Sequence, residues 1–167
     1  MRTDPPAITF STAVVERLTR CVIERLPGTE GAELGPLFAV AVESAAKAYA
    51  RYSGFHVGVA VEIEGGTVFR GCNVENVSYP VGVCAERNAL GAAVVGRSGP
   101  AQPVRLALVA FADEGGEVGQ KACSPCGACR QAIWELNPEC LVHFFVGSPL
   151  TLRNESARAL LPHAFTL

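Results

Sequence analysis

Two apolar runs constrain the fold of this chain more than any other feature. They span Val104 to Phe111 and Leu141 to Val146, and neither alternates regularly with polar residues. Such runs are typical of strands that are buried on both faces, and these strands occur where helices cover each side of a sheet. The sequence therefore predicts an α/β architecture built around one central sheet.

In the other segments of the chain, the spacing of apolar residues is typical either of a helix or of a strand. Apolar residues at helical spacing predict five helices, over residues 8–26, 34–52, 84–95, 127–136 and 154–161. Alternating residues predict a hairpin of two strands, 57–63 and 68–72. Asn154 is the predicted cap of the last helix, and residues 73–83 and 113–121 are predicted loops. The order α-α-β-β-α-β-α-β-α predicts a mixed sheet with helices on both faces.

Length, charge and composition limit the possible classes of protein. A chain of 167 residues with 49% hydrophobic residues fits a single domain over 1–167, in which a helical segment 1–52 packs on a core 53–167. The net charge of −2 and the scattered basic residues argue against a nucleic-acid partner. The N-terminus lacks the apolar core of a signal peptide, and no run approaches the ~18 apolar residues that cross a membrane. We therefore expect a cytoplasmic protein without a membrane partner.

The cysteines predict a metal site rather than a disulfide framework. There are seven of them, an odd number, in a chain without an evident secretion signal. Cys84 opens one predicted helix, and Cys126 and Cys129 flank the first turn of another. The unpaired N–H groups and partial positive charge of a helix N-terminus favour thiolate, the form of cysteine that binds metal. Three sulfur ligands leave one position of a zinc tetrahedron for water, as in catalytic sites, so we expect one zinc ion per chain.

Glu86 follows Cys84 by two residues and can face the open position of such a site. A carboxylate there can take a proton from water, whose pKa zinc lowers to about 7. Arg87 can hydrogen-bond a ligand sulfur and reduce the negative charge of three thiolates. Two alternatives remain at this point. Glu86 can simply complement the dipole of its helix, and Cys123 can close the site as a fourth ligand of a structural zinc module.

Five segments spread over most of the chain resemble the small, homotetrameric cytidine deaminases: Y-S-G-F-H-V-G (52–58), G-C-N-V-E-N-V-S-Y-P (71–80), C-A-E-R (84–87), S-P-C-G-A-C-R-Q (124–131) and L-L-P-H-A-F (160–165). C-A-E followed by P-C-x-x-C is the zinc deaminase signature, with Cys in place of the first His. The resemblance implies a three-layer α-β-α sandwich with a five-stranded mixed sheet. It also implies hydrolysis of cytidine and 2′-deoxycytidine to uridine and 2′-deoxyuridine with release of ammonia, a reaction of pyrimidine salvage.

The same resemblance implies roles for individual residues. Cys84, Cys126 and Cys129 match the zinc ligands, and Glu86 matches the proton shuttle. The residues that match nucleoside-binding positions are Phe55 in the pocket wall, Asn73 and Glu75 at the ribose 3′-hydroxyl, Ser124 with its carbonyl at the leaving amine, and Phe165 from a neighbouring subunit. We also expect N–H groups around Ala85 to hold the ring carbonyl. The implied assembly is a homotetramer whose active sites are shared between subunits.

Other functions share parts of this pattern. A deaminase of a modified cytosine nucleoside such as blasticidin S would have the same zinc core, but the ribose pair Asn73 and Glu75 argues against it. A nucleic-acid deaminase would need a basic surface, which the chain lacks. A structural zinc module would not need Glu86, and a thiol oxidoreductase that used Cys126 and Cys129 would not explain Cys84.

Overall fold

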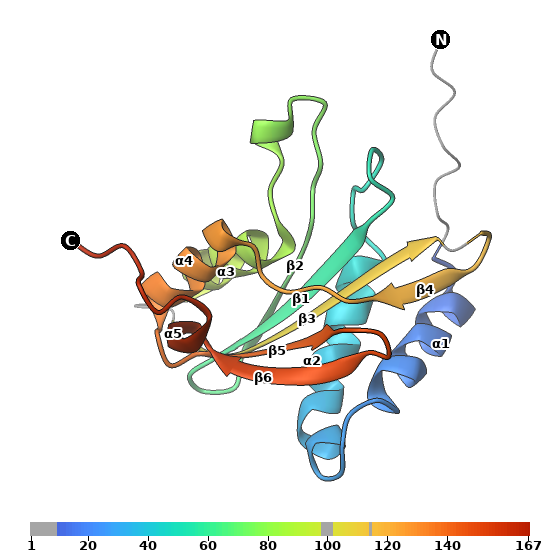
Figure 1. Cartoon of the computed structure of the whole chain (residues 1–167), viewed down its shortest axis with the longest axis horizontal. Helices are drawn as coiled ribbons and strands as arrows, with labels where there is room; N and C mark the ends of the chain where they lie inside the picture. The colour runs from blue at the N-terminus through green and yellow to red at the C-terminus, as the bar shows by residue number, and fades with distance from the viewer. Residues whose placement is uncertain (1–9, 98–101, 114) are drawn as a thin grey trace.

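The structure, a computed structural model, describes residues 10–97, 102–113 and 115–167, and its centre is a mixed sheet (Figure 1). The six strands are β1 (His56–Ile63), β2 (Val68–Cys72), β3 (Pro103–Asp113), β4 (Val118–Lys121), β5 (Leu141–Val146) and β6 (Thr151–Ser156). Their order is β2-β1-β3-β5-β6, and β4 pairs with β3 off this path. The β3–β5 pair is parallel, whereas the other pairs are antiparallel.

Helices cover both faces of the sheet. They are α1 (Thr12–Ile23), α2 (Glu30–Ala45), α3 (Ala85–Gly96), α4 (Gly127–Leu136) and the short α5 (Ala157–Leu160), with a 3-10 turn η1 (Tyr79–Val81) between β2 and α3. Figure 1 shows α1 and α2 on one side of the sheet and α3 and α4 on the other. The predicted three-layer α-β-α fold is therefore confirmed. Within the residues that the structure describes, no helix is long and apolar enough to cross a membrane.

The apolar run in β3 shows why the sheet needs two helical layers. Leu106 and Leu108 belong to the core cluster under α3 and α4, whereas Ala107 and Val109 belong to the cluster under α1 and α2. Successive side chains of a strand point to opposite faces, so a strand without polar alternation must be covered twice. All four side chains are almost completely buried. Burial of a leucine contributes about 1.5–3 kcal/mol to folding, so both clusters hold the sheet in place.

Apart from shifts of a few residues at helix ends, such as the start of α2 at Glu30 instead of residue 34, the predicted bounds were wrong in three places. Residues 151–156 form β6, so only Ala157–Leu160 of the predicted last helix is helical, and Ser156 rather than Asn154 caps it by accepting from the Ala159 amide at 3.1 Å. The predicted loop 113–121 contains β4, which adds a sixth strand to the five that were expected. Neither strand has a clear alternation of apolar and polar residues in its sequence. β6 lies at an edge of the sheet with exposed polar residues, and β4 is only four residues long.

The third difference is the end of α2, which stops at Ala45 instead of continuing to residue 52. The chain then turns toward the loop that follows β2. The Tyr49 amide donates to the Asn73 carbonyl at 3.0 Å, and the Glu75 amide donates to the Tyr49 carbonyl at 2.9 Å. These backbone bonds between segments 24 to 26 residues apart replace the helical bonds, and they place residues 49–55 beside residues 73–75.

Gly71 in β2 allows α3 to lie directly on the sheet. A Cβ atom at this position would come within 2.4 Å of both the Ala85 carbonyl oxygen and the Ala89 amide nitrogen of α3. We expect Gly71→Ala to lower the free energy of unfolding by at least ~1–3 kcal/mol, because overpacking forces the helix off the strand. Denaturant titration measures this change.

Gly91→Ala is the matched control. Gly91 lies on α3, the helix that packs against Gly71, but a Cβ atom at Gly91 would meet nothing within 4 Å. Alanine should stabilise the helix by up to about 1 kcal/mol at this position. Equal effects of the two substitutions would contradict the close contact between β2 and α3.

Candidate active site

Three thiols converge where α3 and α4 begin. Cys84 is the N-cap residue of α3, Cys126 is the N-cap residue of α4, and Cys129 lies in the first turn of α4. The sulfur atoms of Cys84 and Cys126 are 3.9 Å apart, and those of Cys126 and Cys129 are 3.5 Å apart. All three sulfurs lie within 4.8 Å of one another, which makes the group able to hold a metal ion.

The electrostatics of the trio fit a thiophilic cation. Burial raises the pKa of Cys84 and of Cys129, and the neighbouring Glu86 and cysteine groups act in the same direction on Cys129. At Cys126, burial also works to raise the pKa, but a hydrogen bond from the Cys129 amide and hydrogen bonds shared with the two other thiols lower it overall. Cys126 is therefore the thiol of the three that ionises most readily, and ionisation of all three sulfurs is favoured by a bound positive charge. Zinc meets this requirement because it takes thiolate ligands in tetrahedral geometry.

Cys123 stays outside this trio. Its side chain packs against the core under α3 and α4, and burial raises its pKa to about 12, so it remains a neutral thiol. The Cys123 amide donates to the Phe145 carbonyl at 2.9 Å, which ties the start of the Cys126 loop to β5. The geometry thus favours a site with three sulfur ligands over a closed one with four.

Arg130 holds the loop that carries Cys126, a contact that the sequence analysis missed. Its Nε donates to the Pro125 carbonyl at 2.8 Å, and its Nη1 donates to the Leu160 carbonyl at 3.1 Å. Arg87, the predicted partner of a ligand sulfur, is exposed, and in the described part of the chain no hydrogen bond joins it to a sulfur. The role of Arg87 stays a prediction.

Glu86 lies in the first turn of α3 and is only 4% exposed. Burial raises its pKa above the ordinary value, and this effect outweighs hydrogen bonds from its own amide and from the Cys129 thiol. A buried carboxyl group beside the thiol cluster, with a raised pKa, holds a proton more readily than an exposed one and can accept and return it. Ala85, next to it, is completely buried at the start of the helix.

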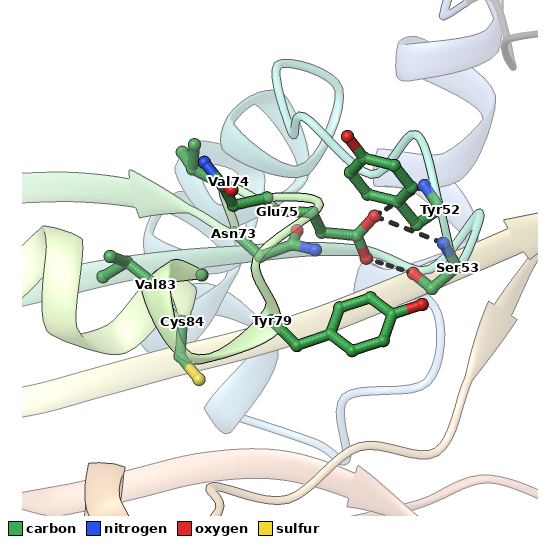
Figure 2. A pocket seen from close by; sticks show the side chains of 10 residues that line it. Tyr52, Ser53, Asn73, Val74, Glu75, Tyr79, Val83 and Cys84 are labelled. Carbon is green, nitrogen blue, oxygen red and sulfur yellow. Dashed lines mark hydrogen bonds between the residues drawn. The ribbon is translucent and has the colours of Figure 1, made fainter.

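A pocket of about 490 Å³ opens beside Cys84 (Figure 2). Two of the predicted nucleoside-binding residues, Asn73 and Glu75, line it together with Cys84. The other lining residues are Tyr52, Ser53, Val74, Asn76, Tyr79, Gly82 and Val83. Tyr52, Ser53 and Tyr79 lie in segments that resemble the deaminase family, but the motifs alone predict no role for them.

Asn73 connects the pocket to the start of β1. Its Nδ2 donates to the Phe55 carbonyl at 2.9 Å, and its Oδ1 accepts from the Val57 amide at 2.8 Å. Phe55 itself is half-buried. Because a side-chain amide has two N–H donors and two acceptor positions, Asn73 keeps one of each for a ligand.

Glu75 is held by the segment that precedes β1. Its Oε2 accepts from the Tyr52 amide at 2.8 Å and from the Ser53 amide at 3.2 Å, and its Oε1 accepts from the Ser53 hydroxyl (Figure 2). Burial works to raise the pKa of Glu75, but these hydrogen bonds and the nearby His56 outweigh it and lower the pKa below its ordinary value. The pocket therefore contains an ionised carboxylate of fixed orientation.

Four of the predicted nucleoside-binding residues do not line this pocket: Phe55, Ala85, Ser124 and Phe165. Ser124 is exposed, two residues before Cys126. Phe165 is 70% exposed, and the Gln131 side chain holds its backbone by accepting from its amide at 3.0 Å and donating to its carbonyl at 2.9 Å. Figure 1 shows the C-terminal tail leaving the molecule beyond α4 and α5. Phe165 is thus presented outward rather than into the pocket of its own chain.

Comparisons with known proteins agree with this geometry. The family model described as the cytidine and deoxycytidylate deaminase zinc-binding region matches residues 34–144. A cytidine deaminase of Sporosarcina psychrophila is 37% identical over 132 residues, which cover 78% of this chain and 89% of that protein. A blasticidin-S deaminase of Bacillus cereus is 31% identical over 87 residues, 52% of this chain and 61% of that protein.

Solved structures give the same result. The crystal structure of cytidine deaminase from Burkholderia pseudomallei superimposes with a TM-score of 0.67 at 40% identity, and the match covers 78% of this chain and 97% of that one. The match to the family model includes Cys84, Cys126 and Cys129 and spans both helices that begin at the thiol cluster. The chain therefore belongs to the cytidine and deoxycytidylate deaminase family, as its sequence motifs predict.

Proposed function

We propose that this protein is a zinc-dependent cytidine deaminase, which hydrolyses cytidine and 2′-deoxycytidine to uridine and 2′-deoxyuridine and releases ammonia. One observation carries the proposal: Cys84 of the thiol cluster lines the same pocket as Asn73 and Glu75. The cluster provides the chemistry at one end of the pocket, and the amide and carboxylate provide polar groups for a sugar at the other. The relatives named cytidine deaminase support this assignment.

Each residue has a role in the proposed reaction. Cys84, Cys126 and Cys129 would hold one zinc ion, which would supply Lewis-acid activation of a water molecule. Glu86 takes a proton from water and delivers it to N3 of the cytosine ring. It then takes the proton of the hydroxyl group added at C4 and delivers it to the departing amine, which leaves as ammonia. N–H groups around Ala85 hold the ring carbonyl, and the Ser124 carbonyl accepts from the leaving amine. Asn73 and Glu75 bind the ribose 3′-hydroxyl, and Phe55 forms part of the wall.

The charge of the pocket predicts its substrates. Glu75 is a carboxylate, and neither lysine nor arginine is among the lining residues. We expect cytidine and 2′-deoxycytidine to be deaminated far faster than their 5′-monophosphates, at least roughly 10-fold in kcat/KM, because a phosphate would enter without a cation to pair with it. Parallel assays of ammonia release measure the ratio.

Blasticidin S belongs in the same panel as a control for the related deaminase activity. It lacks the sugar hydroxyls that Asn73 and Glu75 are proposed to bind, so it should be the poorer substrate. A preference for the monophosphate or for blasticidin S would contradict the proposed nucleoside pocket.

We also propose that the protein forms a homotetramer with shared active sites. Several large apolar side chains are exposed on the loop beside the pocket and at the C-terminus: Val77 (78%), Tyr79 (79%), Val81 (60%) and Phe165 (70%). Exposed apolar side chains beside a pocket are typical of an interface, and a tetramer would cover them.

The chain is proposed to act as one domain, 1–167, in which the segment 1–52 packs on the core 53–167. A reducing compartment such as the cytoplasm would keep its seven cysteines available as thiols.

Shared sites make a specific prediction about mixed tetramers. Phe165→Ala should weaken nucleoside use without removing zinc, by the ~1–3 kcal/mol that a stacked aromatic contributes. Glu86→Ala should be inactive for lack of a proton carrier. Tetramers co-assembled from the two variants should regain activity above either parent, because some sites combine an intact Glu86 with an intact Phe165 from the neighbour. Activity equal to the average of the parents would place Phe165 outside the neighbour's site.

A further inference from the structure

We propose that Ser53 is a positioning residue that orients the Glu75 carboxylate toward the sugar 3′-hydroxyl and so sets the preference for substrates that carry this hydroxyl. The inference rests on the proposed nucleoside function of the pocket and assigns a role to a residue that no sequence argument singled out. Ser53 lines the pocket beside Glu75, on the segment between α2 and β1 (Figure 2).

The direction of the hydrogen bond between the two side chains follows from a third residue. The Phe55 amide donates to the Ser53 hydroxyl oxygen at 2.9 Å. A serine hydroxyl has one proton and two acceptor positions, and Phe55 occupies one of the acceptor positions. Because the ionised Glu75 carboxylate can only accept, the single Ser53 proton points at Glu75 Oε1. Ser53 thus links the carboxylate to the backbone at Phe55, just before β1.

The acceptor positions of Glu75 that remain free determine how many hydrogen bonds it can accept from a ligand. A carboxylate has about four acceptor positions, two on each oxygen. On Oε2, the Tyr52 and Ser53 amides take both positions. On Oε1, the Ser53 hydroxyl takes one position. One position on Oε1 remains, so Glu75 is prepared to accept a single hydroxyl group from the substrate.

The two amides alone do not fix this orientation. Both of them hold Oε2, so without the Ser53 hydroxyl the carboxylate can turn about that contact and move Oε1 away from the sugar. The hydroxyl is the contact that fixes Oε1 itself. Removing it should therefore affect recognition of the 3′-hydroxyl more than recognition of the base, which lies at the thiol end of the pocket.

The test compares 2′-deoxycytidine with 2′,3′-dideoxycytidine, which lacks the 3′-hydroxyl, on the zinc-loaded protein. The wild-type preference in kcat/KM should be on the order of 10- to 100-fold, as expected for a hydrogen bond to a charged group. Ser53→Ala should reduce this preference by roughly 3- to 10-fold. The loss should come from a higher KM for 2′-deoxycytidine, with dideoxycytidine used nearly as well as before. Ser53→Thr, which keeps a hydroxyl, should restore the preference.

Ser11→Ala is the matched control, because Ser11 also accepts from a backbone amide, that of Val14, but does not line the pocket. It should leave the preference unchanged. Equal losses for both substrates in Ser53→Ala, or an unchanged preference, would overturn the positioning role. If the wild type deaminates neither nucleoside, the proposed function fails, and calorimetric binding of the same two nucleosides to wild type and Ser53→Ala still decides the inference by the same ratio.

Discussion

Glu86→Gln is expected to lower kcat for cytidine by about 10²–10⁴-fold or more while the protein keeps its fold and its zinc. Glutamine has the shape of glutamate but cannot take up a proton and return it. Glu86 is only 4% exposed, and burial raises its pKa, so it is suited to carry a proton between water and the base. Steady-state kinetics of the zinc-loaded variant, with zinc per chain measured by atomic absorption, give the result.

Glu135→Gln provides the control for this substitution. Glu135 is exposed on α4, away from the pocket lining, so the same chemical change there should leave kcat within about twofold, as expected for a surface site. Near-normal turnover by a zinc-loaded Glu86→Gln protein would contradict the proton-transfer role and leave only the helix-dipole interpretation of this residue.

Cys84→Ser is expected to have the second large effect, on metal binding as well as activity. A serine hydroxyl does not replace a thiolate, so the variant should bind zinc more weakly by more than the ~10–100-fold typical of changes around the ligands. Stability should fall as well, because each tenfold loss of zinc affinity lowers the free energy of unfolding by about 1.4 kcal/mol when zinc is in excess. Chelator titration and thermal unfolding with and without zinc measure both changes.

Two other cysteines serve as controls for Cys84→Ser. Cys123→Ser tests the rival ligand near the site, and Cys72→Ser tests a half-buried thiol that donates to the Lys47 carbonyl at 3.5 Å outside the cluster. Both should retain about one zinc per chain. Full zinc retention by Cys84→Ser, or loss of zinc from Cys123→Ser, would contradict the assignment of the three ligands.

The sequence predicted those parts of the fold whose burial is strong and continuous. The runs in β3 and β5 are buried on both faces, so their composition alone identified them. The edge strand β6 was not predicted because all six of its residues are at least partly exposed, and its sequence T-L-R-N-E-S resembles a capped helix start. The thiol cluster was predictable although 42 residues separate Cys84 from Cys126, because Cys84 begins one helix and Cys126 and Cys129 flank the first turn of another, where thiolate is favoured.

Contacts between distant segments could not be predicted in the same way. Arg130 reaches the Leu160 carbonyl across 30 residues of sequence, and Ser53 reaches Glu75 across 22. Such contacts form only when the whole chain has folded. An arginine or a serine in the sequence does not by itself indicate which distant residue it will contact. The sequence analysis therefore identified the residues proposed to do the chemistry but missed those that hold them in position.

Product analysis with purified, zinc-loaded protein and cytidine is the decisive test of the proposed deamination. We expect uridine and ammonia to appear in equal amounts, removal of zinc by a chelator to stop the reaction, and added zinc to restore it. Absence of uridine and ammonia with a folded protein that contains about one zinc per chain would show that the protein is not a cytidine deaminase.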